Sequence, residues 1–292
     1  MTRIAAFKTS IAASFAALAL TTGMSAANAA VVISYPNFTG ACSGGGLTCV
    51  GSAAVTGGAL RLTPALTGQH GAGYSTTGIA LGSGATFSTT FEFQMTQRGG
   101  IAPADGLTFV LSAASAGLGG AGGGLGYSGV PNSVAIEFDT FNNGENGASN
   151  HVGIDTNGNL NNNGISPYGV SNCSSNSGYI AGCMSNGDVW TVTIDYDGTN
   201  NLLDVYVQDA AQALQHIIAG ASINISTLLG TNTAFVGFTA ATGAGFENHD
   251  ILRWQLANDR SLGNPTVPEP GSLALLGAGL FAAAFMRRRR AA

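Results

Sequence analysis

Alternation of apolar and polar residues over two long segments is the feature that most limits how this chain can fold. Apolar side chains, with Thr at 89, occupy alternate positions over 87–95 and 190–196, and Ser, Thr, Glu, Gln or Asp lie between them. Successive side chains of a β-strand point to opposite faces, so this period predicts strands with one buried face. The period recurs at 203, 205 and 207 and at 252, 254 and 256, and only 225–230 suggests a helical turn. The pattern predicts an all-β sandwich.

The N-terminal segment has the three parts of a secretory signal peptide. Arg3 and Lys8 precede an apolar run at 11–20, and Ala27-Asn28-Ala29 offers a cleavage site of small residues. Export would place the four cysteines where disulfides form. Cys42 and Cys49 are close in sequence, as are Cys173 and Cys183, although all three connectivities remain open.

The C-terminal segment also has three parts. Val-Pro-Glu-Pro-Gly at 267–271 precedes an apolar stretch at 272–286 and four arginines at 287–290. The stretch barely spans a bilayer core of about 30 Å, and the arginines would stay cytoplasmic. The order resembles the PEP-CTERM sorting tail of exopolysaccharide-producing Gram-negative bacteria. That resemblance implies an exosortase-type processing enzyme, transient membrane association, and final placement at the cell surface or in the extracellular matrix. A plain C-terminal anchor is the alternative.

The expected organisation is therefore a signal peptide (1–29), one domain (30–258), a linker (259–266) and the sorting tail with its short transmembrane segment (267–292). Without Arg3, Lys8, Glu269 and the terminal arginines, 14 acidic and 4 basic residues remain. This acidic balance repels nucleic acids and anionic lipids. Neutral glycans or cation-bridged surfaces are better suited as partners.

Two carboxylates share one face of a predicted strand near the middle of the chain. The apolar residues at 134, 136 and 138 point to one face, so Glu137 and Asp139 point to the other. Such a pair repels itself unless a cation neutralises it. Asn143 and His151 lie on a Gly/Asn-rich loop that could complete a shell of oxygen and imidazole ligands. The pattern predicts a metal site at the end of a strand.

Four segments, in order, resemble the legume-type (L-type) lectins. Glu-x-Asp-x-Phe-x-Asn from Glu137, followed by His-Val-Gly-Ile-Asp from His151, resembles the metal-binding loop of that family. Ala-Asp-Gly-Leu at 104–107 resembles its sugar-binding segment, and 235–243 with 248–254 resemble its last two strands and specificity loop. The resemblance covers 32–256 and implies a concanavalin-like jelly-roll sandwich of two antiparallel sheets.

The resemblance also implies a set of metal ligands: Glu137, Asp139, Phe141 through its carbonyl, Asn143, Glu145, Asn146 and His151. The first two acids and the histidine would hold a transition metal such as manganese, whereas Asp139, the Phe141 carbonyl and Asn143 would hold calcium. The donor types agree with these preferences. The family places an Asp that bridges both metals where this chain has Glu145 and Asn146, so calcium is better supported than manganese. The alternative is a solvated acidic loop.

The implied sugar-binding residues are Asp105, Gly123, Phe141, Asn143, Ala244 and Gly245. A carboxylate accepts two hydroxyl hydrogen bonds, an amide donates one, and an aromatic ring covers the apolar face of a pyranose. The resemblance implies a cis peptide bond before Asp105. An ordinary Asp-Gly turn is the alternative role for Asp105. His249 and Asp250 are expected to be structural.

The function expected from these observations is that of an exported, surface-sorted, carbohydrate-binding protein that uses calcium and is not an enzyme. One alternative is a calcium-stabilised structural protein of the exopolysaccharide matrix, which would need Asn143 but not Asp105. The other is a glycoside hydrolase on the same sandwich. Some such hydrolases carry Glu-x-Asp-x-Glu on one strand, and here the third position is Phe141.

Overall fold

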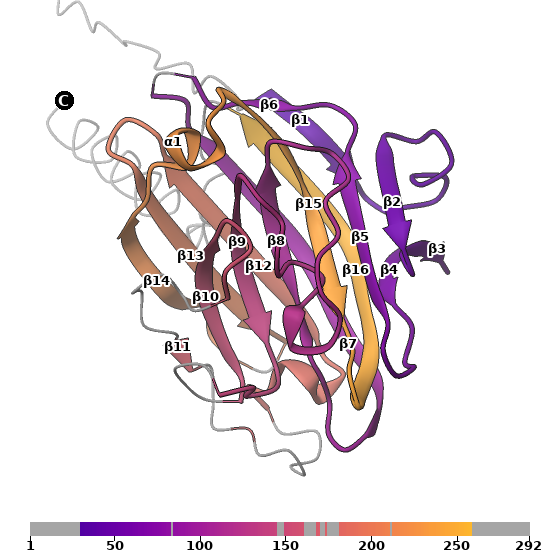
Figure 1. Cartoon of the computed structure of the whole chain (residues 1–292). Helices are drawn as coiled ribbons and strands as arrows, with labels where there is room; N and C mark the ends of the chain where they lie inside the picture. The colour runs from indigo at the N-terminus through magenta and orange to yellow at the C-terminus, as the bar shows by residue number, and fades with distance from the viewer. Residues whose placement is uncertain are drawn as a thin grey trace, which may run out of the picture.

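Two antiparallel β-sheets stacked face to face make up the computed structural model of the chain (Figure 1). The structure describes residues 30–82, 84–144, 149–160, 168–169, 173, 181–210 and 212–258. The predicted signal peptide, linker and sorting tail lie outside these residues, as do Glu145 and Asn146. Within the described part, no helix has the length and apolar character needed to cross a membrane.

The first sheet, called sheet A, runs in the order β14-β13-β12-β7-β16-β4-β3, and β1 also pairs with β16. Its strands are β1 (Ala30–Tyr35), β3 (Ala54–Thr56), β4 (Ala59–Thr63), β7 (Phe87–Gly100), β12 (Val189–Asp197), β13 (Leu202–Asp209), β14 (Gln215–Ser222) and β16 (Gly245–Asn258). The predicted hairpin after Asp197 is present, because Asp197 of β12 pairs with Leu202 of β13.

The second sheet, called sheet B, runs in the order β11-β10-β9-β8-β15-β5-β2, and β6 also pairs with β15. Its strands are β2 (Leu47–Gly51), β5 (His70–Ser75), β6 (Ile79–Ala80), β8 (Gly106–Ser112), β9 (Ser133–Asp139), β10 (His151–Thr156), β11 (Tyr168–Gly169) and β15 (Thr233–Ala241). The short helical elements are the 3-10 turns η1 (Gly122–Gly124) and η3 (Met184–Asn186) and the predicted helical turn α1 (Ile225–Leu229).

The main hydrophobic core lies between the two sheets and confirms the predicted alternation. Phe91 and Phe93 of β7 and Trp190 of β12 are buried, whereas Glu92 and Thr191 between them are only partly buried. Phe91 contacts Phe109, Phe138 and Phe238 of sheet B through ring pairs with centroids 4.9–5.9 Å apart. Packed aromatic pairs of this kind add stability beyond their buried area.

Two features of the core differ from a simple alternation. A register shift between Ile251 and Arg253 of β16 leaves Ile251 buried and Leu252 only partly buried, so the expected inward position of Leu252 is wrong. In sheet B, every residue of β8 and β9 is buried. A second cluster that includes Tyr74, Tyr127 and Val130 covers the outer face of these strands. Period alone cannot reveal a face that a distant loop covers.

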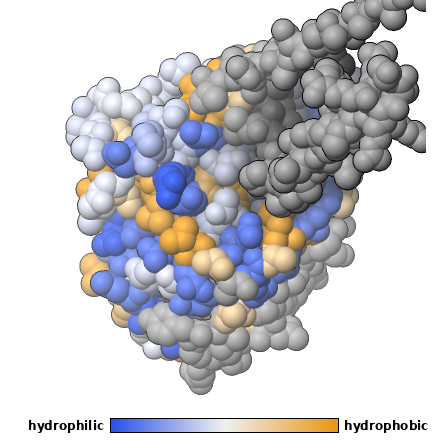
Figure 2. Space-filling model, turned by 180° about the vertical axis from the view of Figure 1, so that it is seen from behind, coloured by the Kyte–Doolittle hydropathy of each residue, from blue (hydrophilic) through white to orange (hydrophobic). Residues whose placement is uncertain are grey.

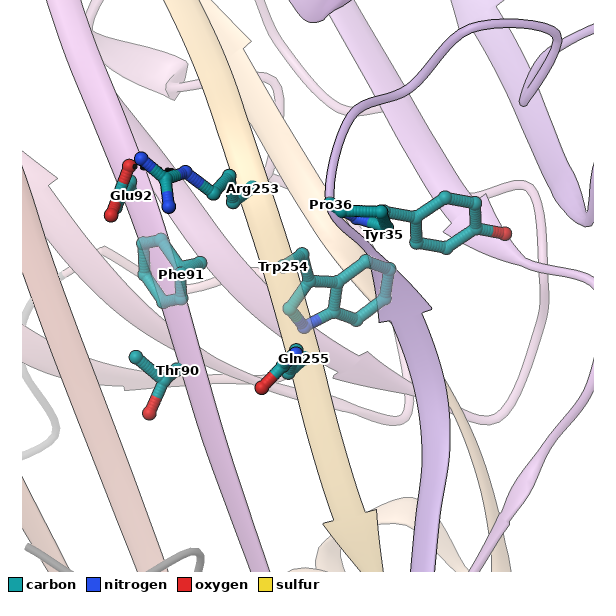
Figure 3. Close-up of a pocket in the computed structure, with 8 residues that line it drawn as sticks. All are labelled: Tyr35, Pro36, Thr90, Phe91, Glu92, Arg253, Trp254 and Gln255. Carbon is teal, nitrogen blue, oxygen red and sulfur yellow. Dashed lines mark ion pairs between the residues drawn. The ribbon is translucent and has the colours of Figure 1, made fainter.

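The outer face of sheet A is mostly polar and partly buried, and groups of apolar residues lie among hydrophilic ones where this face is seen from behind (Figure 2). A hollow of about 250 Å³ lies there, where β1 ends at Tyr35 beside β16 and β7 (Figure 3). An ion pair between Glu92 Oε2 and Arg253 Nε, 3.0 Å apart, joins β7 to β16 at this hollow. Of the predicted sugar and metal ligands that the structure describes, none lines this hollow.

Candidate metal and sugar site

Three of the seven predicted metal ligands come together at the end of β9. Each of Glu137, Asp139 and His151 offers one ligand atom, and these atoms all lie within 4.8 Å of one another. His151 begins β10 opposite Asp139, and its Nε2 lies 3.0 Å from Glu137 Oε1. All three side chains are about 1 % exposed. The alternation of β9 therefore places them as expected, on the face opposite Ile136 and Phe138.

The backbone turn after β9 is held by short polar contacts. The Phe141 amide donates to Asp139 Oδ1 over 2.6 Å, and the Gly144 amide donates to Asn142 Oδ1 over 2.8 Å. Asp and Asn side chains commonly hold turns in this way. Phe141 is partly buried and Asn143 is exposed. Glu145 and Asn146, predicted at the bridging position, follow outside the described residues.

Negative charge accumulates on this face of sheet B. The pKa of the neighbouring Tyr127 is raised to about 12, mainly because burial disfavours its charged form. Hydrogen bonds with Ser133 and the Gly158 backbone oppose this rise, whereas the carboxylates of Asp155 and Glu137 add to it. Two buried carboxylates beside an imidazole are a donor set that fits a divalent cation. These three residues thus fit the transition-metal site that the resemblance implies.

Asp105 lies beside this cluster, in the loop that precedes β8. The Ala104–Asp105 peptide bond is cis, which confirms that expectation. The Asp105 carbonyl accepts a hydrogen bond from the Thr140 amide over 2.9 Å, and its amide donates to the Ala241 carbonyl over 3.1 Å. Gly106 pairs with Asp139 across β8 and β9. The segment after β9 and the end of β15 therefore both hold Asp105 in place.

Glycines from two other loops approach these polar side chains. A Cβ at Gly243, in the turn between β15 and β16, would lie 3.2 Å from Asp105 Oδ2, and one at Gly122 would lie 3.9 Å from it. A Cβ at Gly123 would meet the side-chain amide of Asn143. The structure thus brings the predicted Asp105, Gly123 and Asn143 into one place. Their roles as sugar ligands stay predictions.

Ala244 and Gly245, the predicted residues of the specificity loop, contact the segment between β7 and β8. Ala244 accepts a hydrogen bond from the Ile101 amide, and a Cβ at Gly245 would lie 2.9 Å from Ala104 Cβ. Both predicted residues therefore adjoin the segment between β7 and β8, whereas the preceding Gly243 packs against the Asp105 carboxylate. Sequence reasoning did not single out Gly122 and Gly243 as site residues. Gly243 is the last residue of the matched segment 235–243, and Gly122 directly precedes the predicted Gly123.

The predicted structural roles of His249 and Asp250 are confirmed. His249 Nδ1 lies 2.6 Å from Thr63 Oγ1 in the buried interior. Asp250 accepts two hydrogen bonds from the Arg61 guanidinium, over 2.8 and 2.7 Å. These contacts join β16 to β4, and they raise the pKa of Arg61.

Comparison with protein-family models identifies two regions. Residues 30–269 match the legume lectin domain, and residues 266–290 match the PEP-CTERM protein-sorting motif. A lectin alpha chain from Lablab purpureus is 29 % identical over 231 residues, which cover 72 % of this chain and 76 % of that one. Matches to three further plant lectins or lectin-related proteins span 59–62 % of those chains.

Solved structures of plant lectins share the fold. The metal-free form of lectin I-B4 from Griffonia simplicifolia superposes with a TM-score of 0.64 at 26 % identity, covering 78 % of this chain and 99 % of that one. A Bauhinia forficata lectin in complex with GalNAc gives a TM-score of 0.64 at 22 % identity, covering 79 % of this chain and 98 % of that one.

The family model and the relatives named above are lectins, which supports the expectation that the chain is not an enzyme, so the glycoside-hydrolase alternative is set aside. The family model covers every strand of the sandwich, and the fold and the order of the matched segments agree with it. The chain therefore belongs to the legume lectin family.

Proposed function

We propose that this protein is an exported lectin that binds a surface or matrix glycan, with calcium ordering its sugar site. The observation that carries the proposal is the meeting of Asp105, Gly123 and Asn143 next to the buried cluster of Glu137, Asp139 and His151. A buried acidic cluster of this kind favours a bound cation, and the adjacent polar groups suit sugar hydroxyls.

In this proposal, the metal ligands divide by donor type. Asp139, the Phe141 carbonyl and Asn143 offer the oxygen ligands that calcium prefers. His151 and Glu137, with Asp139, suit a transition metal such as manganese. Glu145 or Asn146 would occupy the bridging position, where the longer Glu side chain is the better ligand. When bound, calcium would fix the loop that carries Asn143.

The sugar contacts follow from the same geometry. The Asp105 carboxylate would accept hydrogen bonds from two sugar hydroxyls, and the Gly123 amide and the Asn143 side chain would donate to others. The partly buried Phe141 ring would cover an apolar sugar face. Ala244 and Gly245 would bound the site on the side of the β7–β8 segment.

A glycan array probed with the mature protein tests this function directly. We expect calcium-dependent binding to a limited set of sugars, and loss of that binding with a chelator. The array should include GalNAc, because the Bauhinia forficata lectin was solved with it. Absence of binding to every sugar, with calcium present and the protein folded, would contradict the proposal. That result, combined with calcium-dependent stability, would favour the matrix-scaffold alternative.

Localisation in the proposal rests on the two ends of the chain. The match of residues 266–290 to the sorting motif indicates export and surface sorting in Gram-negative bacteria. We propose that residues 1–29 are removed on export, that the tail associates transiently with the membrane, and that an exosortase-type enzyme then releases the domain.

Tail processing leads to a prediction for the mature protein. If Pro268-Glu269-Pro270 directs sorting, the protein recovered from wild-type cells should lack the arginines at 287–290. Intact-mass measurement of the surface fraction checks this. Cells without the processing enzyme provide the control, because they should retain the uncut chain. An uncut C-terminus in wild-type membranes would instead support a simple anchor.

A further inference from the structure

The residue before the histidine of the metal cluster is held by a turn from elsewhere in the chain. Asn150 immediately precedes His151, and its side chain is about 1 % exposed. Its Nδ2 donates to the Gly182 carbonyl over 3.3 Å, and its Oδ1 accepts from the Met184 amide over 2.9 Å. Both hydrogen-bonding groups of this buried amide are therefore used by residues on either side of Cys183.

A disulfide anchors that turn. Cys183 is bonded to Cys173, and the Ser149 hydroxyl donates to the Cys173 carbonyl. The two residues before His151 thus contact both ends of one disulfide: Ser149 contacts Cys173, and Asn150 contacts the backbone flanking Cys183. The turn is also tied to β13, because the Gly182 amide donates to Asp209 Oδ2 over 3.3 Å.

The same turn reaches the sugar side of the site. Ser185 donates to Oε1 of the buried Glu247 over 2.7 Å, and the Thr140 hydroxyl lies 3.3 Å from that oxygen. Thr140 in turn donates its amide proton to the Asp105 carbonyl. The turn from Cys183 to Asn186 is therefore connected by hydrogen bonds both to the residue before His151 and, through Glu247 and Thr140, to Asp105.

We infer that the Cys173–Cys183 disulfide and Asn150 position His151, so that the affinity of the Glu137–Asp139–His151 cluster for a divalent cation depends on this bond. The inference rests on the metal site of the proposed function. His151 is the first residue of β10, and strand ends open more readily than strand centres. Residues that orient metal ligands without touching the metal typically change metal affinity by about 10- to 100-fold when removed. Asn150 is thus a positioning residue.

The chain offers a matched control in its other disulfide. Cys42 and Cys49 form a bond with a similar sequence separation, 7 residues against 10. Cys49 lies in β2, which is separated from β9 and β10 in sheet B by β5, β15 and β8. Loss of either bond releases a short covalent loop, but among the described residues only the Cys173–Cys183 disulfide and the residues flanking Cys183 contact Ser149 and Asn150.

The experiment measures Mn²⁺ binding, because imidazole with carboxylates suits a transition metal. The exported protein and the variants C173S/C183S, C42S/C49S, Asn150→Ala and Asn224→Ala are titrated with Mn²⁺, and free Mn²⁺ is followed by its paramagnetic resonance signal. Asn224 caps α1 at the opposite end of the sandwich. Near-UV circular dichroism first establishes that each variant is folded at the temperature used.

We expect Kd for Mn²⁺ to rise about 10- to 100-fold in C173S/C183S and in Asn150→Ala, and to stay unchanged in the two control variants. An unchanged Kd in both C173S/C183S and Asn150→Ala would overturn the inference, as would an equal rise in the controls. Should C173S/C183S fail to fold, Asn150→Ala with its intact disulfide decides the outcome. Failure of the wild-type protein to bind Mn²⁺ would also overturn it, whereas calcium-dependent sugar binding on the array would still stand.

Discussion

Replacing Asp105 by Asn is expected to abolish glycan binding while leaving the metal site intact. The side chain keeps its shape, but one carboxylate oxygen becomes an amide nitrogen that cannot accept a hydroxyl proton. A hydrogen bond to a charged group contributes about 1.5–3 kcal/mol, so weakening two of them should lower affinity by about a hundredfold or more. Glycan binding is measured on the array and by calorimetry with the best sugar found there.

The control for this variant is Asp195→Asn. Asp195 lies in β12 between the inward-facing Ile194 and Tyr196, so its side chain lies on the outer face of sheet A. It should bind glycan as the wild-type protein does. Asp105→Asn should also keep the calcium-dependent rise in melting temperature, because Asp105 is not a proposed metal ligand. Normal glycan binding by Asp105→Asn would refute the sugar-site assignment.

Calcium is expected to raise the stability of the folded domain substantially. A ligand that binds only the folded state at about a hundred times its Kd adds about 2.7 kcal/mol to the free energy of unfolding. For a domain of this size, that corresponds to a rise in melting temperature of roughly 5–11 °C. Asp139→Ala should remove the rise, because Asp139 is the ligand proposed to serve both metals. Thermal melts with calcium and with a chelator measure the effect.

Asp195→Ala serves as the control for Asp139→Ala, since it removes a carboxylate from the other sheet. It should retain the full calcium-dependent rise. If calcium and chelator leave the wild-type melting temperature unchanged, the assignment of the calcium site is wrong, whatever the glycan array shows. If Asp139→Ala keeps the rise, calcium binds elsewhere in the chain.

The strands were predictable because their signal is local. The two-residue period of the sequence predicted one buried face, and the structure buries the residues on it, among them Phe91, Phe93 and Trp190. The burial of both faces of β8 and β9 was not predictable, because Tyr127 and Val130 reach them from a loop. The position of Leu252 was missed for another reason. A register shift inside a strand cannot be recognised from the amino-acid composition of that strand.

The site was predictable only in part, for a similar reason. Glu137 and Asp139 share a face of one strand, so their proximity follows from the strand period alone. The approach of Gly243 to Asp105, and of Met184 to Asn150, joins loops far apart in the chain. Such contacts depend on how the two sheets close on each other. Likewise, sequence spacing left three ways to pair the four cysteines. The folded chain has the pairing with the two shortest loops, Cys42–Cys49 and Cys173–Cys183.

The glycines around Asp105 also bear on how this domain can acquire a new preference. Gly243 leaves room for the Asp105 carboxylate, and Gly123 leaves room for the Asn143 side chain. A side chain at Gly123 would collide with a proposed ligand instead of extending the site. Point substitutions of these glycines are therefore expected to abolish sugar binding. New specificities should instead evolve through insertions in the turn at Ala244, where the exposed chain can lengthen without displacing Asp105.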